Sequence, residues 1–493
     1  MTIIQRYAAA PTKSEKIRGG LGHPVIDADG HLLEVEPVLL DYIKAVGGSK
    51  LQHRYETFMA SRPYDKWHGM SWDERRANRP MRPAFWFTPA ANTVDRATAM
   101  LPGLLRSRLD EIGVDVSVLY PTQGLAVWRI GDSELRLGVI RALNDMNADL
   151  FSSYGDRLIP AAVIPMQAPQ EALDELAHAV GTLGMKAIMI EGTIRRPFPT
   201  TQQGVIERPG DNKAFWIDSL GIDSAHDYDP VWRRCVDLKV SPTIHTGTMG
   251  WGARCSISNY NYNHIGHFAA GNEAVCKALF MGGVTRRFPS LRFGFLEGGV
   301  GWACSLYNDL IEHWEKRHIG VIEQNLDPAM IDRALLVDLF DRYGDARHRE
   351  KIDQIRLGDG TYFDQHPERP EDIDDWAACE IQQKQDLRDL FVPNFYFGCE
   401  ADDRMAVWAF NDKVNPMNAR LKAMFSSDIG HWDVPDATNV LAESHRLVEM
   451  GLMSTDDYRD FVFGNAVTLY AGLNSDFFKG TTVEAEAARE LTA

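Results

Sequence analysis

The sequence predicts a (β/α)₈ barrel with long insertions, and three observations support this fold. Eight short apolar runs are rich in β-branched and aromatic residues and end in polar residues or glycine. The runs are continuous rather than alternating, as in strands that are buried on both faces of a parallel sheet. Segments with helical spacing lie between them, and this alternation favours a barrel. A doubly wound open sheet is the alternative, although no glycine-rich phosphate-binding turn supports it.

The eight runs are expected to be the barrel strands. In chain order they are VIDADGH (25–31), VSVLYPT (116–122), LIPAAVIP (158–165), MKAIMIEG (185–192), VSPTIHTG (240–247), LRFGFLEG (291–298), NFYFGCE (394–400) and AMFSSDI (423–429). The expected helices carry apolar stripes, or begin with proline and acidic residues and end at glycine. They include SELRLGVIRALNDMNADLFSSY, PQEALDELAHAVGTLG, FAAGNEAVCKALFMGGV and WACSLYNDLIEHWEKRH.

We expect one large domain between two short terminal segments. Residues 1–22 are expected to be an N-terminal arm, mobile over 5–22, residues 23–475 the barrel, and residues 476–493 a C-terminal tail. Three connections, near 40–105, 195–235 and 319–390, are too long for plain barrel loops. Insertions of this size often form lids or contact surfaces, so we expect a homo- or hetero-oligomer.

Composition excludes several classes of partner. Of the 493 residues, 44% are hydrophobic and 25% are charged, which is enough apolar material for a large core. The 52 basic and 69 acidic residues give a net charge of −17, which argues against nucleic acid or a membrane surface as the main partner. The mean hydropathy is −0.28, and no apolar membrane span or secretory signal is recognisable. We therefore expect a cytoplasmic protein whose six scattered cysteines are reduced.

The expected strands end in carboxylates and imidazoles, where a barrel places its working residues. The first strand ends with Asp29 and His31, which are two residues apart and therefore share a face. Asp27 is expected to face the other way. The candidates after strands five, six and eight are His245, Glu297, Asp428 and His431. Two further histidines, His264 and His267, lie in the segment NYNHIGHF after strand five. Such a set predicts a divalent metal site for Zn, Fe or Mn.

Each of these residues also has a purely structural interpretation. Asp29 could cap the turn that follows it, and Glu297 could bind backbone amides. A single histidine at a strand end, such as His245, is more often hydrogen-bonded than metal-binding, and His264 and His267 could be surface residues. All of these interpretations holding together is less probable, because the residues fall at one level of the expected barrel. The metal site is therefore the favoured interpretation.

Four segments carry a resemblance to a known family. VIDADGH, PTIHTG, GGVTRRFPSLRFGFLEGGVGW and MFSSDIGHWD, in this order, resemble the amidohydrolase superfamily. The most similar branch is the amidohydrolase-related group that includes the aminocarboxymuconate semialdehyde decarboxylase-like enzymes. The resemblance runs from about residue 23 to FGNAVTLYAGLN at 463–474, with gaps at the insertions. It implies a (β/α)₈ barrel with metal at its mouth.

The resemblance also assigns site positions. The family's first-strand His-x-His motif falls on Asp29 and His31, so an aspartate replaces its first histidine. The strand-five metal histidine matches His245, and the strand-eight aspartate matches Asp428. The strand-six catalytic histidine of the decarboxylases falls near Glu297 and is therefore missing.

These replacements imply enough donors for two metal ions. The implied metal ligands are Asp29, His31, His245, His267, Glu297 and Asp428. His267 is preferred to His264 because a histidine just ahead of this helix recurs in the family. The bridging carbamylated lysine of some hydrolases is not expected, because Lys186 lies near the start of strand four.

Three functions remain open. The mixed ligand set resembles that of the amidohydrolase-fold dinuclear iron monooxygenases such as α-aminoisobutyrate hydroxylase. This resemblance favours a dinuclear Fe or Fe/Mn enzyme that hydroxylates a small organic substrate. Separate reductase components would supply its electrons. The alternative is a hydrolase or non-oxidative decarboxylase with one Zn or Mn ion. The third is a catalytically inactive subunit that pairs with an active relative. For an enzyme, we expect Glu297, Asp428 and His431 to be the catalytic residues.

Overall fold

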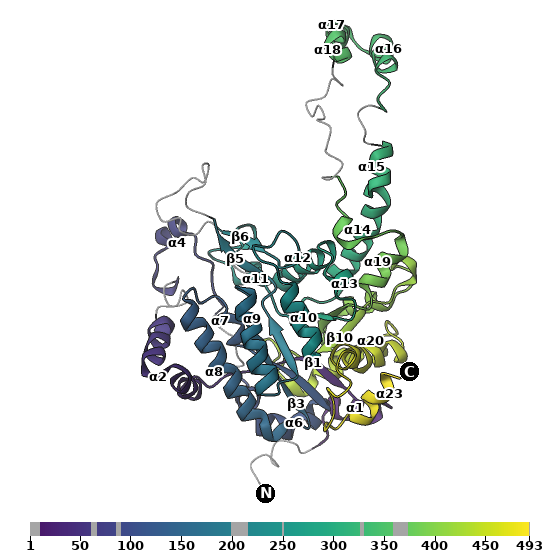
Figure 1. Ribbon diagram of the computed structural model, residues 1–493. Coiled ribbons are helices and arrows are strands. Elements are labelled where there is room, and N and C mark those ends of the chain that lie inside the picture. The colour runs from purple at the N-terminus through teal and green to yellow at the C-terminus, as the bar shows by residue number, and fades with distance from the viewer. Residues whose placement is uncertain are drawn as a thin grey trace.

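The centre of the protein is an eight-stranded parallel sheet (Figure 1). The structure is a computed structural model and describes residues 10–60, 67–84, 90–198, 215–248, 251–325, 330–357 and 373–492. In sheet order, the strands are β1 (Ile26–Leu32), β2 (Val116–Pro121), β3 (Leu158–Ile164), β4 (Ala187–Ile190), β7 (Pro242–Ile244), β8 (Phe293–Phe295), β9 (Phe395–Glu400) and β10 (Lys422–Ser426). Each of the eight apolar runs overlaps one of these strands, so the predicted barrel is confirmed.

Hydrogen bonds beyond the end of β10 close the sheet onto β1. The amide of Asp428 donates to the carbonyl of Asp29 over 3.1 Å, and the amide of His31 donates to the carbonyl of Ile429 over 3.0 Å. In β1 the pairing with β2 shifts register between Asp27 and Gly30. The first and last strands therefore meet at the residues that the sequence marked as metal ligands.

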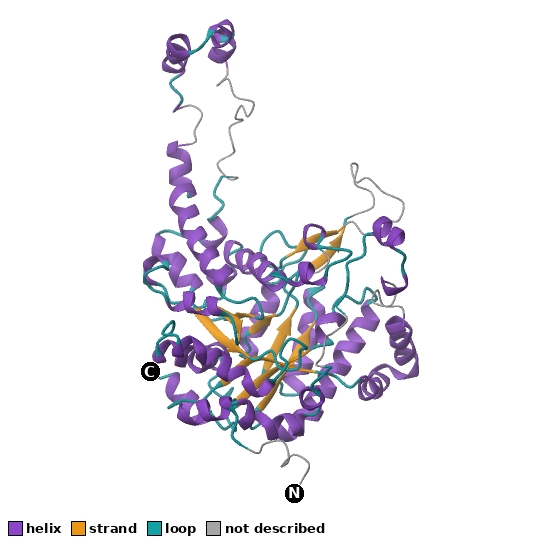
Figure 2. Ribbon diagram, turned by 180° about the vertical axis from the view of Figure 1, so that it is seen from behind, coloured by secondary structure: helices purple, strands orange, loops and turns teal. Residues whose placement is uncertain are grey.

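Helices surround the strands, as Figure 2 shows from behind. The helices of the barrel layer are α8 (Ser133–Phe151), α9 (Pro169–Leu176), α10 (Asp229–Leu238), α12 (His267–Met281), α14 (Gly301–Arg317), α19 (Lys384–Phe391), α20 (Val440–Glu449) and α22 (Asn465–Ala471). Shorter helices lie in the loops: α7 (Gly124–Val127), α11 (Tyr260–His264), α13 (Val284–Arg287) and α21 (Thr455–Arg459). No helix in the described ranges is long and apolar enough to cross a bilayer. All six cysteines are unpaired, as predicted.

The three long connections contain secondary structure of their own. The first holds α2 (Glu36–Ala60), α4 (Trp72–Asn78), α5 (Thr93–Met100) and α6 (Pro102–Ile112). The second forms an antiparallel hairpin of β5 (Ile194–Pro197) and β6 (Phe215–Asp218). The third holds α15 (Ile319–Asn325), α16 (Arg333–Tyr343), α17 (Ala346–Glu350) and α18 (Ile352–Leu357).

The third connection forms an arm that extends away from the barrel (Figure 1). At its end, α16 leaves Leu335, Leu339 and Tyr343 exposed by 51%, 41% and 80%. Exposed apolar side chains on a projecting element are common at protein interfaces. The expected association through the insertions stays a prediction.

Both terminal segments contain ordered structure, which differs from the expectation at the N-terminus. A mobile arm over residues 5–22 is wrong for α1 (Lys13–Gly20), which is capped by Thr12 and held to the barrel by a bidentate pair between Arg18 and Asp115. The C-terminal tail includes α23 (Glu484–Glu490), and Phe477 just before it is buried. Side-chain packing and capping therefore order both segments in the described residues, whereas residues 1–9 lie outside them.

A Gly283→Ala variant is expected to be at least about 3 kcal/mol less stable than the native chain, as measured by urea unfolding. Gly283 precedes α13 at a φ of +71°, and a Cβ there would lie 1.9 Å from the carbonyl oxygen of Ala378. Backbone atoms cannot move aside as a side chain can.

The matched control is Gly451→Ala. Gly451 has a φ of +66°, but nothing lies within 4 Å of its Cβ position. Its substitution should cost only the left-handed backbone, about 1 kcal/mol. Equal losses for the two variants would show that the contact with Ala378 has no energetic weight.

Candidate metal centre

Carboxylates and imidazoles from four strands meet at the carboxyl ends of the barrel. Asp29 and His31 belong to β1, and His245 directly follows β7. Glu297 and Asp428 each follow a strand end by two residues, β8 and β10 respectively. The sequence therefore located five residues that the fold does bring together.

The donor atoms surround one imidazole nitrogen. His31 Nε2 lies 3.3 Å from Asp428 Oδ1, 3.4 Å from His245 Nε2, 3.7 Å from Asp29 Oδ1 and 4.0 Å from Glu297 Oε2. Glu297 Oε2 is also 3.2 Å from His245 Nε2. Ligand atoms of one small divalent ion lie about 2.0–2.2 Å from the ion. Two ligand atoms of the same ion are therefore farther from each other than from the ion, as the donor atoms around His31 Nε2 are.

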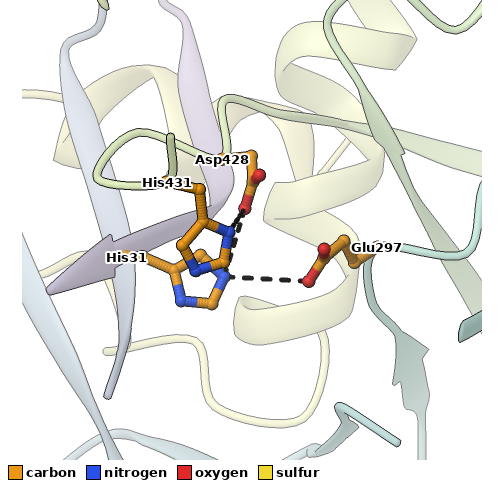
Figure 3. A group of neighbouring side chains, drawn as sticks. All are labelled: His31, Glu297, Asp428 and His431. Carbon is orange, nitrogen blue, oxygen red and sulfur yellow. Dashed lines mark ion pairs between the residues drawn. The ribbon is translucent and has the colours of Figure 1, made fainter. Parts of the chain in front are cut away.

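Two overlapping groups of potential ligands occur in the described residues. One comprises Asp29, His31 and His245, and the other comprises His31, Glu297, Asp428 and His431. Figure 3 shows the second group, with the Asp428 and Glu297 carboxylates directed toward His31 and the His431 ring beside it. Because His31 is shared, the two groups form one continuous donor set.

The donors are buried without sufficient partners of their own. Asp29 is 1% exposed and His245 is 2% exposed, and neither Asp29 Oδ1 nor Glu297 Oε2 has a hydrogen-bond partner. Burial, followed by the charge of Asp428, raises the pKa of Asp29 and of Glu297 well above the usual range of a carboxyl group. Burial likewise lowers the pKa of His245 to about 3. A divalent cation would favour the ionised form of these buried carboxyl groups and would bind them together with the neutral imidazoles, so these residues fit a metal ion.

Two of the candidate ligands have a strained backbone. Glu297 has a φ of +55° and Asp428 a φ of +51°, in the left-handed region that residues other than glycine rarely adopt. A Cβ at Gly398, in β9, would lie 3.4 Å from the amide nitrogen of Glu297. Strand β9 therefore passes close to the turn that carries Glu297. Strain of this kind is typically found at functional sites.

Asp27 faces away from the donors and fixes the strands beneath them. Its carboxylate accepts hydrogen bonds from the hydroxyls of Ser117 and Ser427, both over 2.7 Å, and from the amide of Ser427 over 2.9 Å. A Cβ at Gly30 would lie 2.5 Å from Asp27 Oδ2, so the glycine makes room for this carboxylate. Asp27 thus links β1, β2 and the residue before Asp428. Strict alternation would place Asp27 on the face of Asp29 and His31, and the register shift between Asp27 and Gly30 gives it the opposite orientation that we expected.

His431 is hydrogen-bonded to the donor set. Its Nδ1 lies 2.8 Å from Asp428 Oδ1, and its ring centroid is 3.9 Å from that of His31. Burial alone would lower the pKa of His431, but the charge of Asp428 and the hydrogen bond with it raise the pKa above its ordinary value. His431 can therefore hold a proton beside Asp428.

His267 is not brought into either ligand group. It begins α12, and its ring packs on Phe268, with 3.8 Å between ring centroids, whereas Phe268 in turn packs on His245 over 5.0 Å. His264 lies beyond it, 4.9 Å from His267. The role of His267 as a ligand stays a prediction, and no distance in the described residues supports it.

Glu400, at the end of β9, was overlooked in the sequence. Burial raises its pKa to about 8, and the charge of Asp428 contributes. It also acts electrostatically on Asp29 and Glu297, so it is a fourth carboxylate near the donor set. Strand seven, NFYFGCE, ends on this residue, and the strand-end rule would have found it.

Lys186 lies at the opposite end of β4 and donates to the carbonyl of Phe477 over 2.8 Å, so it is absent from the site.

Comparison with known families agrees with this architecture. A model of the amidohydrolase family matches residues 26–347, which is well over half of the chain. The chain belongs to the amidohydrolase family. The resemblance to this family that the sequence shows is thereby confirmed.

Several solved structures are similar to the chain. An amidohydrolase from Mycobacterium avium subsp. paratuberculosis K-10 is 17% identical, with 91% of this chain and 100% of that chain covered and a TM-score of 0.49. A dihydroxybenzoic acid decarboxylase from Polaromonas sp. JS666, with bound manganese and 2-nitroresorcinol, is 16% identical. The match covers 93% of this chain and 99% of that chain, with a TM-score of 0.47. The 2,6-dihydroxybenzoate decarboxylase from Rhizobium is 14% identical, with 91% of this chain and 98% of that chain covered and a TM-score of 0.46.

Proposed function

We propose that this amidohydrolase is a divalent-metal-dependent enzyme that cleaves a small organic substrate by hydrolysis or non-oxidative decarboxylation. The observation that carries the proposal is the contact of His431 Nδ1 with Asp428 Oδ1 at 2.8 Å, within a buried metal-ligand set. Both reactions need a proton to be moved beside a metal ion, and neither needs a change of oxidation state.

Asp29, His31, His245 and Asp428 would hold the ion, with Mn or Zn as the favoured metals. Such an ion polarises a substrate oxygen and makes a water molecule more acidic. The carboxylate-containing set suits Mn as well as Zn. The resemblance implies that the catalytic histidine of the family's decarboxylases falls near Glu297. Glu297, which lies 3.2 Å from His245 Nε2, would add an anionic ligand rather than a proton donor.

His431 would be the proton carrier. Its Nδ1 is held by Asp428, which leaves Nε2 as the nitrogen that exchanges a proton with the substrate. Thr122 Oγ1 lies 3.3 Å from His31 Nδ1 and so helps to keep His31 Nε2 turned toward the donors. The ring contact between His31 and His431 then fixes the proton carrier above the metal ligands.

The dinuclear Fe or Fe/Mn hydroxylase is a second candidate, and the buried charge favours it. Asp29, Glu297, Glu400 and Asp428 would together carry four negative charges when ionised, of which one divalent ion offsets two. Two ions would neutralise the set, with electrons supplied by separate reductase proteins. The imidazole that this candidate requires from His267 lies outside both ligand groups, so we place it second.

Turnover under strict anaerobiosis separates the two candidates. Protein reconstituted with Mn, Zn or Fe is assayed against a panel of small carboxylic acids and amides, with its metal content measured by mass spectrometry. We expect equal product formation with and without oxygen. A strict requirement for oxygen and reductant would overturn the non-oxidative proposal in favour of the hydroxylase.

A His431→Asn variant is expected to lose about 100-fold or more in kcat, as general acid–base catalysis typically contributes 10²–10⁴-fold. Its metal content should stay at the native level when metal is saturating, because Asp29, His31, His245 and Asp428 are unaltered and the new amide can still donate to Asp428. His53→Asn, at a side chain 82% exposed, is the matched control and should change neither quantity. Native kcat in His431→Asn would show that His431 carries no proton.

A further inference from the structure

Glu34 is a buried carboxyl group three residues beyond His31, and the metal-ligand set does not include it. It is 7% exposed, and among the described residues it pairs with no cation. Burial raises the pKa of Glu34 to about 7, and hydrogen bonds from backbone amides offset this effect only in part. A carboxyl group is costly to bury, so the contacts that Glu34 makes call for an explanation.

The Glu34 carboxyl group holds the chain that leaves β2. The amide of Gln123 donates to both of its oxygens, over 3.0 Å and 3.2 Å. In return, Gln123 Nε2 donates to the carbonyl of Glu34 over 3.2 Å. Gln123 Oε1 accepts from the hydroxyl of Tyr55, in α2, over 3.3 Å. The side chains of Glu34 and Gln123 therefore each bond to the backbone of the other residue, and together they join the two chain segments.

This contact begins where the backbone pairing of β1 and β2 ends. The last pair of the ladder is Leu32 with Pro121, which has no amide hydrogen to donate. The backbone bond that follows runs from the amide of Thr122 to the carbonyl of Leu32 over 3.1 Å. Beyond it, the contact between Glu34 and Gln123 continues the connection through side chains.

The segment that Glu34 holds is also the segment that contacts the ring of His31. Thr122 Oγ1 lies 3.3 Å from His31 Nδ1, and the backbone of Tyr120 also hydrogen-bonds to His31. The other ring nitrogen, Nε2, is the atom around which the metal donors gather. A partner at the outer nitrogen of a metal-binding histidine fixes the orientation of the ring and its tautomer.

We propose that Glu34 is a positioning residue: by holding Gln123, it keeps Thr122 against His31 and so keeps His31 Nε2 directed at the metal ion. The path from Glu34 to the ligand consists of the 3.0 Å bond to Gln123, one peptide unit and the 3.3 Å contact of Thr122. The proposal rests on the metal ion of the proposed function, and adds to it a residue outside both ligand groups.

The Co²⁺ affinity of the full chain, measured by competition with a chelator, tests this role. Glu34→Ala is expected to weaken the affinity about tenfold, the lower end of the 10–100-fold effect of residues that support metal ligands, because Glu34 acts through Thr122. The visible absorption of the bound Co²⁺ should also change, because it depends on the positions of the ligands around the ion. Glu34→Gln keeps an oxygen acceptor for the Gln123 amide and should restore most of the affinity and the native spectrum.

Two further variants separate positioning from stability. Glu175→Ala removes another buried carboxylate, which accepts from Asn144 over 2.8 Å and lies outside both ligand groups. It should lower the stability and leave the Co²⁺ affinity unchanged. Thr122→Val removes the hydroxyl that faces His31 Nδ1. Its loss of affinity and that of Glu34→Ala should be less than additive in the double variant, because both act on the same contact.

Glu34→Asp decides the question if Glu34→Ala does not fold. It keeps the carboxyl group but is shorter by one methylene, so it should weaken Co²⁺ binding as well. Native Co²⁺ affinity in the variant that folds would overturn the positioning role and leave the proposed function in place. Equal losses of affinity in Glu34→Ala and Glu175→Ala would assign the effect to general destabilisation and would also overturn it.

The outcome distinguishes this role from the proposed function. Weakened Co²⁺ binding in Glu34→Ala, in a chain without non-oxidative activity, would overturn the proposed function and leave the positioning role in place. A native chain that binds no divalent ion would overturn both.

Discussion

A His31→Ala variant is expected to lose its divalent ion and, with it, its activity. His31 is the one residue shared by both ligand groups in the described residues, and four donor atoms lie within 3.3–4.0 Å of its Nε2. Even residues that only support metal ligands typically contribute 10–100-fold to affinity. The loss for His31→Ala should therefore be at least about 100-fold, measured by competition with a chelator.

The matched control is His178→Ala. His178 also pairs with a carboxylate, since its Nε2 lies 2.6 Å from Asp145 Oδ1, but it is outside both ligand groups. This variant should retain its metal and its activity. Full metal occupancy in His31→Ala at native affinity would show that the donors around His31 do not bind the ion.

The barrel could be predicted because its strands are buried on both faces. A strand buried on both faces leaves a continuous apolar run in the sequence. Strands β2 and β9 lie entirely within the runs that predicted them. The ends were less well placed where a strand is short. The run at 240–247 contains only three strand residues, Pro242–Ile244, because the residues after them turn toward the site.

Most of the candidate site followed from strand ends, whereas its geometry did not. Asp29 and His31 could be placed on one face from their spacing alone, because strand side chains alternate. The left-handed backbone of Glu297 and Asp428 has no such sequence pattern, since neither position is a glycine. His267 could not be assigned from sequence either, because the orientation of a ring at a helix start depends on what packs around it.

The helix at the N-terminus could have been predicted from its local sequence, although it was not. Thr12 and Glu15 form a capping box, which is a recognisable sequence pattern for a helix start, yet the polarity of the segment suggested a mobile arm. The helix is then held by contacts far along the chain, including the hydroxyl of Ser14, which accepts from the amide of Ala442. Such long-range partners are not visible from one sequence.

An Asp27→Ala variant is expected to lose about 4 kcal/mol in the free energy of unfolding, measured by urea denaturation. The substitution leaves the hydroxyls of Ser117 and Ser427 and the amide of Ser427 without their acceptor in the buried core. Each unsatisfied buried group costs about 1–3 kcal/mol. Metal affinity should also fall about 10–100-fold, because Ser427 immediately precedes Asp428.

Asp27→Asn and Ser117→Ala divide this effect into its parts. Asp27→Asn keeps the volume and one oxygen acceptor, and the serine hydroxyls can rotate to accept from the new amide, so a loss of about 2 kcal/mol is expected. Ser117→Ala removes one hydrogen bond on the β2 side, away from Asp428, and should cost about 1 kcal/mol without affecting metal affinity. A loss of stability in Asp27→Ala with native metal affinity would restrict Asp27 to the fold. Metal affinity that falls in Asp27→Ala but not in Ser117→Ala would instead mean that the link to Ser427 holds Asp428 in its left-handed, metal-facing conformation.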